Sequence, residues 1–108
     1  MKLWIDDVRP APLDSAYEYG EIDYIHIRSV NEAKVLIEFC DEHGGEIELI
    51  DIDHDAGDCA QYGGDYIKLL DWLEETGRNY PIRIHSMNPV GAENMRRIIQ
   101  RNGWTEVK

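Results

Sequence analysis

We expect this chain to adopt an α/β fold built on a parallel β-sheet. Apolar runs of strand length alternate along the sequence with stretches whose apolar residues recur at helical spacing, which is typical of βαβ units. The chain has 108 residues, of which 43% are hydrophobic, so it is long enough to bury one core. We therefore expect a single domain that spans residues 1–108.

Three strands and one helix are predicted in the first half of the chain. Residues 3–5 begin the first strand, residues 24–27 form the second, and residues 48–53 form the third. Ser29 and Glu32 match a capping box, in which two side chains bind backbone amides at the start of a helix. The apolar stripe of this helix, which two glycines end, consists of Ala33, Leu36, Ile37 and Cys40.

The connection between the first and second strands lacks such a pattern. Residues 9–23 contain Pro10, Pro12 and Gly20 and show no helical stripe. A parallel crossover usually contains a helix, and this connection is long enough to hold one. We therefore expect a first helix that is short or irregular.

The second half of the chain predicts two more helices and two more strands. Residues 81–85 fit a fourth strand between the helices, and residues 104–107 fit a short fifth strand after Gly103. The helical stripes consist of Tyr66, Leu69, Leu70 and Leu73 in the first of these helices and of Met95, Ile98 and Ile99 in the second.

The formal net charge of −11 limits the partners of the protein. Residues 1–58 hold 16 acidic and 4 basic side chains, whereas residues 59–108 hold 6 and 7. Such a chain does not bind nucleic acid by neutralising phosphates, so we expect no bulk nucleic-acid binding. No stretch approaches the ~18 apolar residues of a membrane span, and the two cysteines form no disulfide or zinc motif. We expect a cytoplasmic protein without membrane contact, whose protein partner the sequence does not indicate.

Three of the predicted strands end in polar residues. These are Asp6 and Asp7 after the first strand, Asp53, His54 and Asp55 after the third, and His85 and Ser86 after the fourth. In an open parallel sheet, ligands bind at the edge where the carboxyl ends of the strands meet. Clustered carboxylates repel one another unless a cation holds them, which predicts bound Mg²⁺ or Mn²⁺. Neighbouring histidines would also suit Zn²⁺ or Fe²⁺.

Further residues near this edge suit proton transfer and anion binding. His54 and His85 are candidates for acid/base chemistry because imidazole titrates near neutral pH. Asn88, which precedes a proline, is expected to cap the last helix, whose free amides would then face the same edge and bind an anion. Arg9 can either clamp a phosphate or neutralise Asp7, and the sequence does not decide between these roles.

At these positions the chain resembles the receiver domains of two-component signalling, and more closely the cyclic-phosphate processing receiver domains derived from them. The resemblance covers about residues 2–99 and consists of LWIDDVRP at 3–10, DHDAG at 53–57, GDY at 64–66 and HSMNPVG at 85–91. It implies a flavodoxin-like, receiver-like three-layer sandwich with about five parallel strands in the order 2-1-3-4-5. It also implies metal-dependent hydrolysis of a small cyclic phosphate or nucleotide phosphoester.

In this interpretation the polar residues fall into three groups. The metal ligands are Asp6, Asp7 and Asp53. Protons are transferred by His85 and His54, with Asp55 orienting His54. The phosphate is held by Ser86, Asn88, Arg9 and the helix amides. Asp53 could instead accept the phosphoryl group covalently, as in signalling receivers.

Two other functions stay open. The first is a phosphoacceptor receiver, which needs a lysine at the end of its fifth strand, whereas after Ser86 this chain has only Lys108. The second is a catalytically inactive pseudo-receiver that binds metal or nucleotide and docks on a protein.

Overall fold

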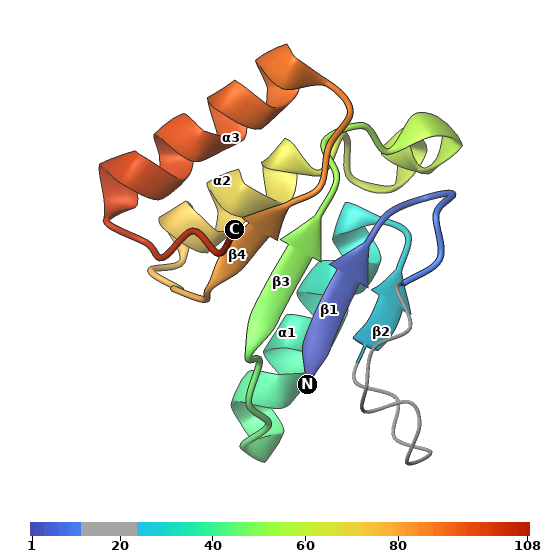
Figure 1. Cartoon of the computed structure of the whole chain (residues 1–108). Coiled ribbons are helices and arrows are strands. Elements are labelled where there is room, and N and C mark those ends of the chain that lie inside the picture. Colours follow the sequence, from blue (N-terminus) through green and yellow to red (C-terminus); the bar gives the residue numbers. More distant parts are fainter. Residues whose placement is uncertain (12–23) are drawn as a thin grey trace, which may run out of the picture.

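The computed structural model describes residues 1–11 and 24–108, and this part of the chain forms a four-stranded parallel sheet (Figure 1). The strands are β1 (Lys2–Ile5), β2 (Tyr24–Ile27), β3 (Leu49–Ile52) and β4 (Ile82–Ile84), in the order β2-β1-β3-β4. The helices are α1 (Val30–His43), α2 (Ile67–Glu75) and α3 (Pro89–Asn102), with a 3₁₀ helix η2 (Gly57–Tyr62). The predicted α/β class with a parallel sheet is confirmed.

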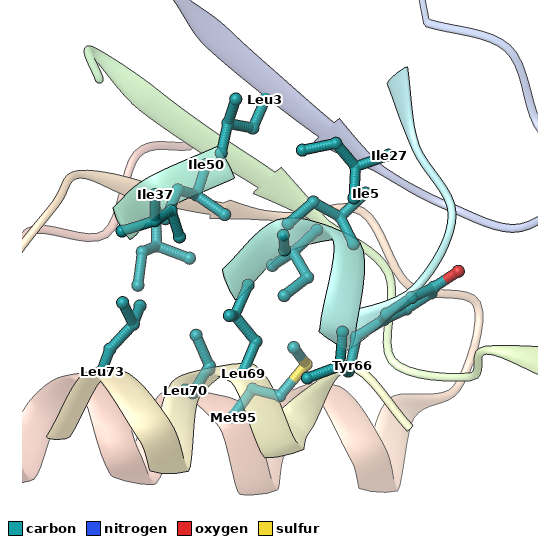
Figure 2. Close-up of a cluster of buried hydrophobic side chains, with 14 of the residues drawn as sticks. Leu3, Ile5, Ile27, Ile37, Ile50, Tyr66, Leu69, Leu70, Leu73 and Met95 are labelled. Carbon is teal, nitrogen blue, oxygen red and sulfur yellow. The ribbon is translucent and has the colours of Figure 1, made fainter. Parts of the chain in front are cut away.

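One face of the sheet packs against the helices. Its fully buried strand residues include Leu3, Ile5 and Ile50, which Figure 2 shows beside side chains of the helices. Ile52 and Ile82 are fully buried in the same cluster. They join one apolar cluster with Ala33, Ile37, Leu69, Leu70, Leu73 and Met95 from the three α-helices. Because side chains alternate along a strand, Trp4 and Asp51, which pair in register, point to the opposite face.

The predicted capping box at the start of α1 is present. The Ser29 hydroxyl accepts a hydrogen bond from the Glu32 N–H at 3.1 Å. The Glu32 carboxylate accepts from the Arg28 N–H at 3.1 Å, one residue before the expected one. Gly44 ends the helix with φ of 75°, a conformation that favours glycine.

Tyr66 fixes the start of α2 against the end of β2. Its side chain is fully buried, and its hydroxyl donates a hydrogen bond to the Arg28 carbonyl at 2.7 Å. Burial raises the pKa of Tyr66 above its ordinary value, so the phenol stays a donor. The segment from β3 to α2, which includes the unpredicted η2, is thereby held at the carboxyl edge of the sheet.

The predicted fifth strand at residues 104–107 is wrong in extent. It is reduced to one parallel bridge between Ile82 and Glu106. The backbone of Ile82 forms hydrogen bonds of 3.0 and 2.8 Å to the two neighbours of Glu106. The segment thus lies beside β4 as expected, but β4 itself has only three residues and offers a short edge for pairing.

Two expectations concern whole segments of the chain. The predicted short or irregular first helix falls on residues 12–23, which lie outside the described residues. Among the helices that the structure describes, none combines the length and apolarity needed to cross a bilayer.

Candidate metal centre

Three carboxylates come together at the carboxyl ends of β1 and β3. Asp6 and Asp7 follow β1, and Asp53 follows β3. Parallel pairing continues past the strands, since the Asp53 N–H donates to the Ile5 carbonyl at 2.9 Å. Asp6, Asp7 and Asp53 each offer an oxygen, and these oxygens all lie within 4.8 Å of one another. The sheet therefore brings together the three residues that the sequence predicted as metal ligands.

The Asp6 carboxylate is buried and accepts four hydrogen bonds. The backbone N–H groups of Val8 and Arg9 donate to Oδ1, both at 2.9 Å. His85 Nε2 and Arg9 Nε lie 3.0 and 3.2 Å from Oδ2. A carboxylate has about four lone-pair positions, so protein donors occupy all of them. Burial alone would raise the pKa of Asp6, but these hydrogen bonds and the Arg9 charge outweigh it and lower the pKa.

The lowered pKa of Asp6 predicts a specific pH dependence of stability. The folded-state pKa lies below the ordinary 3.8, so the ionised carboxylate stabilises the fold above that pH, and this contribution is lost as the pH falls through the folded-state pKa. We expect the free energy of unfolding of the wild type to fall more steeply than that of Asp6→Asn between about pH 5 and 3. Urea unfolding at several pH values measures this, and parallel curves would contradict it.

Arg9 supplies the positive charge of the pocket. Its guanidinium forms ion pairs with Asp6 at 3.2 Å and with Asp53 at 3.6 Å. It also donates a hydrogen bond to the His85 carbonyl at 2.9 Å. Among the described residues it forms no ion pair with Asp7, so the interpretation that Arg9 neutralises Asp7 is wrong. A cation or a phosphate that binds at these carboxylates would instead meet the guanidinium of Arg9 between Asp6 and Asp53.

His85 is held on three sides. Its Nδ1 lies 2.7 Å from Asp51 Oδ1, and its Nε2 lies 3.0 Å from Asp6 Oδ2. Its ring stacks on Trp4 with centroids 3.8 Å apart and planes 1° from parallel. Each ring nitrogen thus faces a different buried carboxylate. The ring therefore braces two buried acids, a contact that the sequence analysis did not predict.

Asp51 and Trp4 are the residues that sequence reasoning missed. Asp51 is 1% exposed in β3, and it is the one polar residue in the strand sequence LIDI. A carboxylate in an apolar strand, two residues before Asp53, was the available signal. Trp4 is 8% exposed and lies on the opposite face of the sheet, outside the helix-packed cluster. Its indole N–H donates to the Arg9 carbonyl at 2.8 Å, which fixes the loop after β1.

His54 lies between Asp55 and the start of α3. Its Nδ1 lies 2.9 Å from Asp55 Oδ1, so the two residues that the sequence paired are in contact. Gly91 packs on the imidazole, because a Cβ at this position would lie 2.5 Å from His54 Cγ. His54, Asp55 and Asp65 also offer ligand atoms within 4.8 Å of one another. Asp65 was not a predicted site residue, and its Oδ1 accepts from the Ala56 N–H at 3.0 Å.

Replacing Gly91 by alanine is expected to displace His54 without weakening α3. Alanine has a higher helix propensity than glycine, but its Cβ cannot coexist with the present ring position. We expect the ring resonances of His54 to shift in an NMR spectrum while the melting temperature stays within a few degrees of the wild type. Unchanged ring resonances would contradict the close contact.

Asn88 caps α3 as predicted. Its Oδ1 accepts from the Gly91 N–H at 3.0 Å, and its own N–H donates to Ser86 Oγ at 3.0 Å. Its Nδ2 lies 3.5 Å from both oxygens of Asp55. The Asn88 amide therefore lies beside Asp55, and the Ser86 hydroxyl lies against the Asn88 backbone.

The start of α3 offers fewer free backbone amides for an anion than expected. Pro89 has no N–H, and the Gly91 and Ala92 amides donate to the side chain and the carbonyl of Asn88. Among the first-turn amides that the structure describes, only that of Val90 lacks a protein acceptor. The expected set of anion-binding amides is therefore a single one, because the cap itself uses the others.

A separate hollow of about 610 Å³ lies between β2 and α1. It is lined by Ile25, His26, Ile27, Glu32, Val35, Leu36 and Phe39. It shares no residue with the carboxylate cluster, and its mostly apolar wall does not suit a phosphate.

Comparison with known proteins agrees with this geometry. The family model of the cyclic-phosphate processing receiver domain matches residues 1–101, so the chain belongs to this family. The match supports the three-layer receiver-like class and confirms the resemblance seen in the sequence. No curated protein and no solved structure matches the chain.

Proposed function

We propose that the protein is a metal-dependent phosphoesterase that opens a small cyclic phosphate or a related nucleotide phosphoester by hydrolysis. The observation that carries the proposal is the convergence of Asp6, Asp7 and Asp53 within 4.8 Å at the carboxyl edge of a receiver-like sheet. The family match supports processing of a cyclic phosphate as the chemistry.

The three carboxylates fit a hard divalent cation, either Mg²⁺ or Mn²⁺. Asp7 is only partly buried, and Gly57 packs on it so closely that any side chain there would meet Asp7 Oδ2. Asp6, Asp7 and Asp53 would hold the ion, and the contact of Arg9 or of His85 with Asp6 Oδ2 would have to open to admit it. The nearby histidines also suit Zn²⁺ or Fe²⁺. Such an ion polarises a phosphoryl oxygen and lowers the pKa of bound water.

The two histidines differ in the contacts they make. His54 touches Asp55 through Nδ1, and we assign it the transfer of a proton through Nε2, with Asp55 orienting the ring. Both nitrogens of His85 face carboxylates, so it can transfer a proton only by breaking one of these contacts. Its main role in this proposal is to position Asp6.

The phosphate would lie where neutral and positive donors meet. The Ser86 hydroxyl, the Nδ2 amide of Asn88, the Val90 N–H and the Arg9 guanidinium are the candidate donors at this edge. These donors offset the repulsion that an acidic chain exerts on an anion.

The proposed partner is thus a small phosphorylated ligand, and a protein partner is not part of the proposal. Cys40 and Cys59 both carry free thiols, which supports a reducing compartment such as the cytoplasm.

The test is phosphorus NMR of cyclic nucleotides and simple cyclic phosphates incubated with the protein, with Mg²⁺, Mn²⁺ or a chelator. We expect a monoester signal that grows only with metal. Metal binding without any product would favour the inactive pseudo-receiver. Labelling of Asp53 by acetyl phosphate without ester hydrolysis would favour the phosphoacceptor receiver.

A further inference from the structure

Three apolar side chains stand exposed in the segments that follow β1 and β4 at the carboxyl edge of the sheet. Val8 is 78% exposed in the loop after β1, and Met87 and Val90 are 85% and 71% exposed at the start of α3. Apolar surface in water is unfavourable, and exposed apolar groups beside convergent polar groups are typical of a ligand-binding site. We call these three residues the apolar collar.

Contacts between the loops place the collar at the acidic pocket. The Val8 N–H donates to Asp6 Oδ1, so Val8 adjoins a candidate metal ligand. Arg9 reaches the His85 carbonyl, so the loop after β1 touches the end of β4. In Figure 1 the loops that follow β1 and β4 extend from the same end of the sheet, beyond the tips of the arrows.

Two of the three collar residues, Met87 and Val90, flank a turn with a defined backbone. Met87 and Val90 flank Asn88 and Pro89, where the side-chain cap and the fixed φ of proline define the backbone. Apolar groups on a preorganised backbone lose little entropy when they bind a ligand. The backbone positions of Met87 and Val90 are therefore set by this turn.

Resting on the proposed function, we propose that the collar binds the nucleobase of a mononucleotide phosphoester. A phosphate held by Ser86, Asn88 and Arg9 leaves the remainder of the ester outside the pocket, where the collar lies. The faces of a base are apolar and uncharged, so thioether and methyl groups contact them without repulsion from a chain of net charge −11. Further phosphates would meet that repulsion, which favours a single nucleotide over an oligonucleotide.

The first test compares adenosine 2′,3′-cyclic phosphate with glycerol 1,2-cyclic phosphate, which has the same reactive ring and no base. We expect the double variant Met87→Ser/Val90→Thr to lower the ratio of their kcat/KM values on the order of tenfold. The control is Val35→Thr, since Val35 is 70% exposed on α1 and lines the separate hollow beside β2, which shares no residue with the carboxylate cluster. An unchanged ratio in the double variant would overturn the proposal.

A second test does not depend on turnover. The chain has three methionines, so methyl-labelled protein gives three signals, and Met95 is fully buried as an internal control. With Mg²⁺ present, adenosine 3′-monophosphate is expected to shift the Met87 methyl signal upfield in a saturable way, and glycerol phosphate is not. Equal shifts with both ligands, or none, would overturn the proposal.

The two tests separate the collar from the proposed hydrolysis. A Met87 shift without reaction of either cyclic ester would refute the hydrolysis and support the collar. Reaction of both esters with the same preference in every variant would support the hydrolysis and refute the collar.

Discussion

Replacement of Asp53 by asparagine is expected to slow the opening of a cyclic phosphate by on the order of 10³-fold. Asparagine keeps the shape of the side chain and the Oδ1 atom that accepts from the His54 N–H at 2.7 Å. It removes one of the three negative charges that would hold a divalent cation. The loss therefore reports on the charge of Asp53 and not on the fold.

Asp58→Asn is the matched control for this substitution. Asp58 is exposed in η2, only five residues further along the chain, and it belongs to neither group of candidate metal ligands. Initial rates from phosphorus NMR give the comparison. Wild-type activity in Asp53→Asn, or equal losses in both variants, would contradict the assignment of Asp53.

Replacement of His85 by alanine is expected to lower the free energy of unfolding by about 3–5 kcal/mol. Asp6 and Asp51 are each 1% exposed, and His85 contacts both. Removing the imidazole leaves two buried carboxylates facing the space that it occupied. It also removes the stacking of His85 on Trp4. Urea unfolding at neutral pH measures the loss.

Two further variants distinguish the loss of the His85 contacts with Asp6 and Asp51 from the general effect of shortening a side chain. Ser86→Ala removes a side chain next to His85 that accepts one hydrogen bond, so it is expected to cost about 1 kcal/mol. Asp51→Asn added to His85→Ala removes the charge of Asp51, whose remaining ion pair is the 3.4 Å contact with Arg83, and is expected to recover part of the stability. A His85→Ala effect as small as that of Ser86→Ala would mean that His85 does not brace the acids.

The carboxylate cluster was predictable because parallel topology alone decides which strand ends meet. Once residues 3–5 and 48–53 were recognised as strands of one sheet, Asp6, Asp7 and Asp53 had to share an edge. The caps of α1 and α3 were equally accessible, since Ser29 and Asn88 act on amides a few residues away. Local and topological features were thus readable from sequence.

Features that depend on the packing of side chains could not be predicted from the sequence. The contact of Asp51 with His85 joins residues 34 positions apart, and the alternation of side chains gives the face of Asp51 but not its partner. The partners of Arg9 depend on the course of the loop after β1, which the indole of Trp4 fixes. The number of free amides at α3 depends on how the cap uses them, and the motif alone does not reveal this.

Manganese titration followed by electron paramagnetic resonance addresses the metal centre itself, because free Mn²⁺ gives a signal that binding suppresses. We expect the wild type and Asp58→Asn to bind one Mn²⁺ per chain, and Asp53→Asn to bind it at least about tenfold more weakly. Equal binding by all three proteins, or none by the wild type, would contradict a metal centre at Asp6, Asp7 and Asp53.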